Sequence, residues 1–185
     1  MGAPVGRKED GAASGVEIEV WDPLVRLFHW TVVAGCIVDL FVLEDGKAGH
    51  RLIGYVVAAA LAVRVVWGFL GSKHARFADF APTPRKLGQY LKALLRREEP
   101  RYIGHNPAGA VLMLTLMGLL AAVSITGWLL TLDAYFGNEA LEELHEGIAD
   151  LILVLAGAHA AAAIYEGRRQ KENLVWAMVT GRKRA

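Results

Sequence analysis

The sequence is poor in cysteine: the single cysteine among its 185 residues is Cys36, which lies in an apolar run. One thiol excludes an internal disulfide, and the absence of a Cys-x-x-Cys-His motif excludes covalent c-type haem attachment. The first twenty residues lack an apolar core with a cleavage site, so we interpret them as a tail and not as a signal peptide.

Apolar residues, by contrast, make up 54% of the chain, more than a soluble domain usually contains. Asp22 and Pro23 provide an N-cap and a first helical residue for one apolar stretch. Four stretches are each close to the roughly 20 residues that span a bilayer: 23–43, 50–70, 107–132 and 144–165. We therefore predict an all-α membrane protein, with a cytoplasmic tail over residues 1–17 and one four-helix domain over residues 18–185.

Positive charge is missing from one side of this arrangement. Residues 133–143 contain no lysine or arginine, whereas residues 71–106 and 166–185 are rich in both. Lysine and arginine favour cytoplasmic loops, so both termini are predicted to be cytoplasmic. The expected topology is an up-down-up-down four-transmembrane-helix bundle in a bacterial inner membrane.

The long basic connection contains a candidate surface helix. Thr83 and Pro84 begin it, Pro100 ends it, and its leucines and Tyr90 share one face while basic residues lie elsewhere. This pattern is typical of an amphipathic helix lying on the bilayer. A shorter candidate covers residues 173–180. We expect both to anchor the bundle to the cytoplasmic membrane surface.

Two histidines occur in the last apolar stretch. His145 and His159 are fourteen residues apart, which places them on one helix face and roughly 21 Å apart along its axis. Ionisable or polar residues inside a membrane segment indicate function first. The alternative for each residue is a buried histidine that hydrogen-bonds to a neighbouring helix.

The other membrane histidines match these two in depth. His29 lies seven residues into the first stretch and His159 lies six before Tyr165, so both are about 10 Å from the cytoplasmic boundary. His50 and His145 each begin a stretch at the outer boundary. Two facing imidazoles suit the axial positions of a haem iron, whereas zinc or copper sites need three or four ligands together. We predict two non-covalent, bis-histidine b-type haems; four structural histidines are the alternative.

Two further residues are candidates for cofactor contact. Gly54 lies one turn beyond His50, where a flat macrocycle would need to approach the backbone; ordinary small-residue helix packing would look the same. Arg64 lies fourteen residues after His50 and level with the inner pair. It would pair with a haem propionate, or extend its side chain to the cytoplasmic interface.

Several motifs together resemble the bacterial cytochrome b561 family. They are VWDPLVRLFHW at 20–30, HRLIGY at 50–55, RVVWGF at 64–69, KHARFADF at 73–80, GHNP at 104–107 and the closing stretch 173–184. The family includes the cytochrome b subunit of nickel–iron hydrogenases. The resemblance implies a four-helix bundle with two b-type haems that passes electrons between quinone and a periplasmic partner. Its ligand positions fall on His29, His50, His145 and His159.

Three functions are compatible with this sequence. The first is electron transfer between the quinone pool and a periplasmic c-type cytochrome, dehydrogenase or hydrogenase subunit. The second is a free-standing superoxide-to-quinone oxidoreductase, and the third is a haem-free membrane anchor or transport protein. A homo-oligomer is compatible with each, and nothing indicates nucleic-acid binding. Quinone would contact a loop cluster at the cytoplasmic ends, although lipid phosphate is an equal candidate for it: His74, Arg76, His105 and Asn106.

The outer loop carries carboxylates without a base between Asp133 and Glu146. Such a patch would attract a soluble partner with basic residues around its cofactor. The alternative is that these acids only solvate a loop.

Overall fold

The computed structural model describes residues 16–185, and most of the predicted tail lies outside this range. In chain order the described elements are β1 (Glu17–Glu19), α1 (Pro23–Phe41), α2 (Ala48–Leu70), η1 (Lys73–Ala75), α3 (Phe77–Phe80), α4 (Pro84–Arg96), α5 (Pro107–Leu129), η2 (Asp133–Tyr135), α6 (Glu139–Gln170), α7 (Leu174–Thr180) and β2 (Arg182–Arg184). Glu17, the last residue of the predicted tail, begins β1.

Four helices, α1, α2, α5 and α6, are long and apolar enough to cross a membrane. The predicted stretches lie almost entirely within them. The last helix is longer than predicted, because the Asn138 side chain caps its first turn and the left-handed residue Lys171 ends it. Its 32 residues span about 48 Å, so α6 extends beyond a 30 Å hydrocarbon core.

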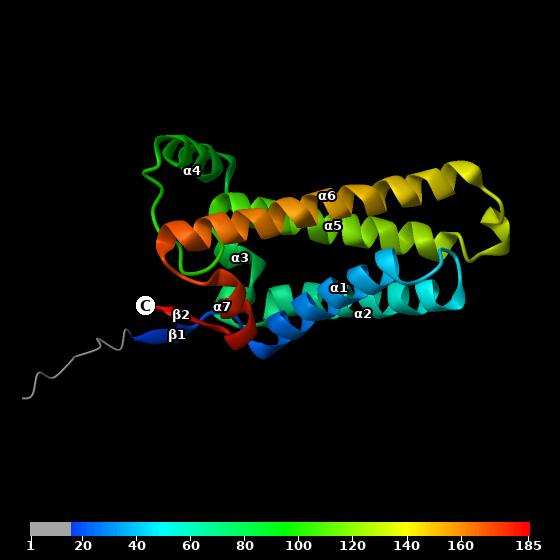
Figure 1. Ribbon diagram of the computed structural model, residues 1–185, viewed down its shortest axis with the longest axis horizontal. Coiled ribbons are helices and arrows are strands. Elements are labelled where there is room, and N and C mark those ends of the chain that lie inside the picture. The colour runs from blue at the N-terminus through cyan, green and yellow to red at the C-terminus, as the bar shows by residue number, and fades with distance from the viewer. Residues whose placement is uncertain (1–15) are drawn as a thin grey trace, which may run out of the picture.

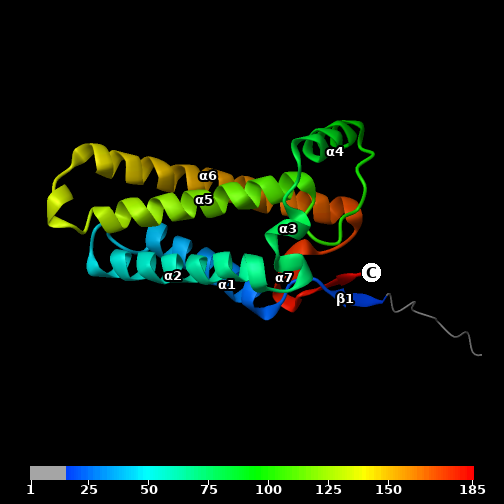
Figure 2. The same cartoon turned by 180° about the vertical axis from the view of Figure 1, so that it is seen from behind.

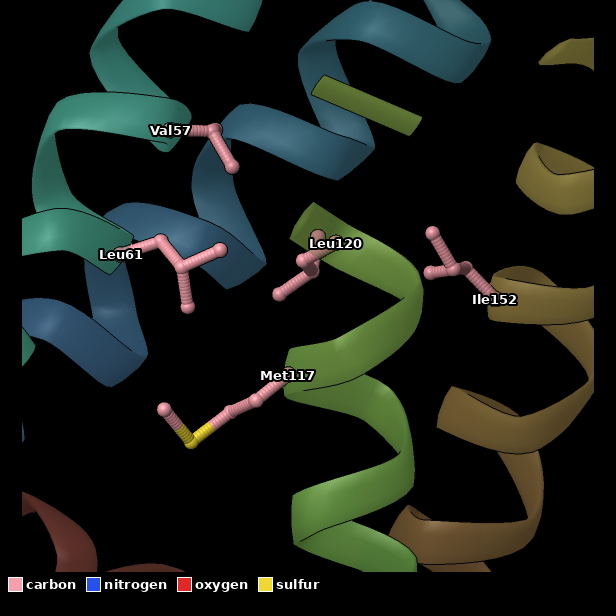
Figure 3. Close-up of a cluster of buried hydrophobic side chains, with 5 residues drawn as sticks. All are labelled: Val57, Leu61, Met117, Leu120 and Ile152. Atoms are coloured by element: carbon pink, nitrogen blue, oxygen red, sulfur yellow. The ribbon is translucent and has the colours of Figure 1, made fainter. Parts of the chain in front are cut away.

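The four long helices form two neighbouring pairs. Helix α1 packs on α2, α2 on α5, and α5 on α6, and the α1–α2 and α5–α6 loops lie at the same end (Figures 1 and 2). A small apolar cluster holds the pairs together at mid-length (Figure 3): Val57, Leu61, Met117, Leu120 and Ile152. Many outward apolar side chains stay exposed, including Phe69 and Leu70, as expected of helices that contact lipid.

The opposite end of the bundle is closed by short elements from both ends of the domain. Strands β1 and β2 pair antiparallel, with Ile18 opposite Lys183. Lys183 is buried against the ring of Trp21, and α7 lies beside the sheet (Figure 1). The sequence analysis did not predict these strands, because three-residue strands have no recognisable periodicity.

Helix α4 begins as expected at Thr83, whose side chain accepts a hydrogen bond from the Lys86 amide. It ends at Arg97, which has left-handed backbone angles. Tyr90 is buried against Tyr102, whereas Leu91 and Leu95 are exposed. The helix lies at the end opposite the two hairpin loops (Figures 1 and 2).

Candidate functional site

At the hairpin-loop end, His50 and His145 face each other. His50 lies in the first turn of α2 and His145 in the second turn of α6. Their ring centres are 6.0 Å apart and the ring planes differ by 75°. Two imidazoles on opposite sides of one metal ion, each with a metal–nitrogen bond of about 2 Å, have ring centres roughly 6 Å apart. This separation suits an iron held between them.

The Nδ1 atoms of both rings have polar neighbours. His50 Nδ1 is 3.0 Å from Asp39 Oδ1 of α1. The contact is mainly electrostatic, because neither atom has a well-aligned hydrogen bond among the described residues. His145 Nδ1 is 2.9 Å from the Thr126 hydroxyl of α5. Each ring is therefore oriented through Nδ1, which leaves Nε2 for a ligand.

The Thr126 hydroxyl has two kinds of partner. It is 3.1 Å from the carbonyl oxygens of both Ala122 and Val123 and 2.9 Å from His145 Nδ1. When its one hydrogen is donated to the backbone, its oxygen accepts from the His145 Nδ1–H group, and this tautomer leaves a lone pair on Nε2.

A cavity of about 660 Å³ adjoins the pair. It is lined by both histidines and Asp39, and by residues of all four long helices. Gly54 lines it too, and a Cβ added there would meet no atom within 4 Å. At Gly127, in contrast, an added Cβ would lie 2.9 Å from the His145 ring, so a glycine is required for that helix to approach. The lining is mostly apolar, as a macrocycle site requires.

His29 of α1 and His159 of α6 lie at the other end of the bundle. His29 contacts the neighbouring Trp30 ring edge-on. Its Nδ1 is buried and has no hydrogen-bond partner among residues 16–185. The apolar cluster at mid-length, which includes Leu61 and Met117, separates this pair from the outer pair.

Arg64 is buried beside the inner end, with only 2% of its surface exposed. One guanidinium nitrogen, Nη2, donates to the Ala75 carbonyl at 3.1 Å, and the group lies over the Phe77 ring. Nη1 has no partner in the described part of the chain. The side chain therefore does not extend to solvent, and it presents a cation with an unused donor.

His105 is the residue whose role the sequence indicated least clearly. It is sandwiched between the rings of Trp21 and Phe80, with centroid distances of 4.7 and 5.0 Å. Burial, followed by the nearby charges of Lys183 and Arg64, lowers the pKa of His105 to about 3. Its Nδ1 has no partner within residues 16–185. His105 is thus a neutral, buried ring and not an exposed loop residue.

The described residues contain no cluster of metal-ligating side chains larger than a pair. Across residues 16–185, no group of three or more histidine, cysteine, aspartate or glutamate side chains is placed to hold a metal ion. His50 and His145 form a pair without a third ligand of this kind, which agrees with haem iron better than with zinc or copper.

Neither Asp39 nor Thr126 was singled out from the sequence. Both contact the Nδ1 atoms of the outer histidines. A weak signal for Asp39 was present, because a carboxylate inside an apolar stretch needs a partner. The contact of Thr126 with His145 could not be recognised from the sequence, since a threonine hydroxyl in a membrane helix commonly bonds only to the backbone of its own helix.

Comparisons with known proteins identify the family of the chain. The family model described as prokaryotic cytochrome b561 matches residues 20–181. Two relatives are each described as a probable Ni/Fe-hydrogenase B-type cytochrome subunit. The protein from Rhodobacter capsulatus is 26% identical, covering 90% of this chain and 81% of its own length. The one from Bradyrhizobium diazoefficiens is 25% identical, covering 90% and 85%.

No solved structure matches the chain. The family match covers all four membrane-length helices and every histidine pair described above. The predicted resemblance is therefore confirmed: the chain is a multi-pass membrane protein that belongs to the prokaryotic cytochrome b561 family, whose members transfer electrons through b-type haem.

Proposed function

We propose that this protein carries electrons across a bacterial inner membrane through two non-covalent b-type haems. One lies between His50 and His145 at the outer side, and the other between His29 and His159 at the cytoplasmic side. The single observation that carries the proposal is the 6.0 Å separation of the His50 and His145 rings beside a cavity of about 660 Å³. Haem supplies reversible one-electron chemistry.

The residues of the outer site would hold the macrocycle and restrict its reactions. With histidine at both axial positions, iron has no free position for oxygen or substrate. The smooth backbone at Gly54 leaves room for a flat ring, and apolar residues such as Leu120 keep water out of the cavity wall. These features favour outer-sphere electron transfer over bond chemistry.

Arg64 would bind the inner haem. Its unpartnered Nη1 is a buried donor in the inner half of α2, and a propionate carboxylate would supply the missing acceptor and the opposite charge. His29 has a buried ring with an unused Nδ1, which leaves it free to ligate through either nitrogen. Arg64 would thus orient the haem while the two histidines bind its iron.

The proposed topology is an up-down-up-down bundle with both ends of the domain in the cytoplasm. The basic residues near α4 and after α6 support this orientation, as does the acidic α5–α6 loop. The exposed Leu91 and Leu95 of α4 support its placement as an amphipathic helix on the cytoplasmic membrane surface.

Quinone is the proposed membrane substrate, and the relatives' descriptions favour a hydrogenase as the periplasmic partner. His74 and His105 lie close together at the inner end, since an added Cβ on Gly104 would be 3.5 Å from His74 Nδ1. The next residue, His105, packs between Trp21 and Phe80. This neighbourhood is our candidate for the quinone contact.

The function is tested by the haem content of the purified chain. Acid–acetone extraction should remove all haem, and the ratio of haem to protein should approach two. His50→Ala and His145→Ala should each remove the same redox component, and His29→Ala and His159→Ala should each remove the other. A ratio near one, or shared loss between His29→Ala and His145→Ala, would contradict the proposal.

A further inference from the structure

The two proposed haem sites differ in what holds their histidines. At the outer site, both Nδ1 atoms have an oxygen neighbour: an Asp39 carboxylate oxygen at 3.0 Å and the Thr126 hydroxyl at 2.9 Å. Neither His29 Nδ1 nor His50 Nδ1 has an aligned hydrogen bond among the described residues. The two differ in that the Asp39 carboxylate oxygen lies 3.0 Å from His50 Nδ1. The Arg64 guanidinium, a buried cation, lies in the half of α2 toward the inner end and donates to a backbone carbonyl.

We infer that Asp39, assisted by Thr126, is a positioning residue that lowers the reduction potential of the outer haem below that of the inner haem. This inference rests on the proposed haem ligation. It attributes the difference in reduction potential between the two haems to the contacts that Asp39 and Thr126 make with the Nδ1 atoms of the proposed ligand histidines.

The physical reason is the charge of the iron. A carboxylate close to Nδ1 polarises the imidazole and makes the opposite nitrogen a stronger donor, which stabilises ferric iron more than ferrous iron. The Asp39 side chain is only 20% exposed, so water screens its negative charge weakly. The carboxylate therefore favours the oxidised haem both through the ring and through space.

Thr126 acts in the same direction but more weakly. Its hydroxyl is neutral, and when it donates its hydrogen to the α5 backbone it accepts from His145 as a dipole and not as a charge. It would also fix the ring plane of His145, which lies against Gly127. We expect the Thr126 contribution to be a minor part of the difference.

Two haems with a low outer and a high inner potential favour electron movement from the periplasmic side to the cytoplasmic side. A donor outside the membrane would then reduce the outer haem, and quinone near the inner end would be reduced. The contacts of Asp39 and Thr126 thus give the bundle a preferred direction, which a symmetric pair of sites would lack.

Redox titration of the purified full chain tests this inference. The component that is lost in His50→Ala should have the lower midpoint potential. Asp39→Asn should raise that midpoint and leave the other unchanged, Thr126→Val should raise it less, and Asp39→Glu should restore most of the shift. Electron paramagnetic resonance should show altered ferric g-values for the outer haem alone.

Asp150→Asn is the matched control, because Asp150 lines the same cavity from α6 but contacts neither ring nitrogen. An equal upward shift in Asp150→Asn would show that general negative charge, not the Asp39–His50 contact, sets the potential. Two intact haems with unchanged midpoints in Asp39→Asn would overturn the inference and leave the proposed function standing. A chain without two haems would instead overturn the proposed function.

Discussion

The outer and inner ends of this bundle use the same ligand type in different surroundings. At the outer end, a cavity separates the helices and the histidine rings are already 6.0 Å apart. At the inner end, the short elements close the bundle, and the buried charged groups have both signs: Arg64, Lys183 and Glu166. Helix α6 therefore contributes a histidine to each of two sites that differ chemically. The difference comes from the residues that the neighbouring elements place around each histidine.

The largest effect is expected from filling the outer cavity. Gly54→Leu should abolish binding of the outer haem while the fold is retained, since an added side chain at Gly54 has open space in the protein but would occupy the haem's place. The measurement is haem per protein, which should fall from two to one.

Gly118→Leu is the control for this substitution. Gly118 lies in α5 and an added Cβ there also meets no atom within 4 Å, but the residue does not line the cavity. Both haems should remain in this variant. If Gly54→Leu also retains both haems, the cavity is not the outer haem site.

Substitution of Arg64 should weaken haem binding at the inner site alone. Arg64→Leu removes a buried charge but keeps apolar volume, which often leaves stability unchanged. We expect the inner haem to bind more weakly by roughly tenfold or more, in line with the loss of a charge-assisted hydrogen bond. Haem titration of the apoprotein measures this affinity.

Arg51→Leu tests whether the loss of any arginine from α2 weakens binding of the inner haem. Arg51 is exposed near the outer end of the same helix, so its loss should leave the affinity for the inner haem unchanged. Equal weakening in the two variants would show that Arg64 acts through general charge and not through a propionate.

A smaller effect is expected on stability at the inner end. Asp22 caps α1 through the Val25 amide, and its other oxygen accepts from Trp67 Nε1 and from the Ser72 hydroxyl. Asp22→Ala removes a cap and two hydrogen bonds between α1, α2 and the following turn. We expect a loss of about 2–4 kcal/mol, measured by thermal unfolding in detergent with circular dichroism.

The Asp22 contribution should also depend on pH. Burial raises the pKa of this carboxyl, but the hydrogen bonds from Ser72, Trp67 and the backbone outweigh it and hold the pKa below its ordinary value of 3.8. A carboxylate with a lowered folded pKa stabilises fully above the unfolded pKa and loses that stabilisation as pH falls through the folded pKa. The stability difference between the native chain and Asp22→Asn should therefore narrow below about pH 4; a constant difference would contradict this.

The smallest effect concerns the outer acidic loop. Changing Glu139, Glu142 and Glu143 to glutamine should slow association with a basic cytochrome c by a few-fold at low salt. All three residues are exposed, and the difference should vanish as ionic strength rises. Stopped-flow electron transfer measures it.

The control for the loop is a pair of exposed acids at the cytoplasmic end, Glu19 and Glu98. Their change to glutamine should not alter the rate or its salt dependence. If the loop variant behaves like this control, the loop is not a docking surface, and a permanently bound enzyme subunit becomes the better candidate for the partner.

The parts of the molecule that depend on long apolar stretches and on regular helical spacing were predictable from the sequence. The membrane helices, the caps at Asp22 and Thr83, and the grouping of His50 with His145 all follow from apolar length and helical spacing. The β1–β2 pairing and the contacts of Asp39 and Thr126 did not, because they join residues far apart in sequence and depend on how helices rotate about their axes.

The fourteen-residue spacing between His145 and His159 has a consequence for what changes in length this protein tolerates. Many side chains of α6 are exposed towards lipid, such as Val154, so most apolar exchanges there should be harmless. A single inserted residue between the histidines would turn one of them by about 100° relative to the other and lengthen their separation by about 1.5 Å. Variation among functional descendants of this chain should therefore accumulate in α6 as substitutions, while insertions and deletions are confined to the segments that follow Gln170 or precede Glu139.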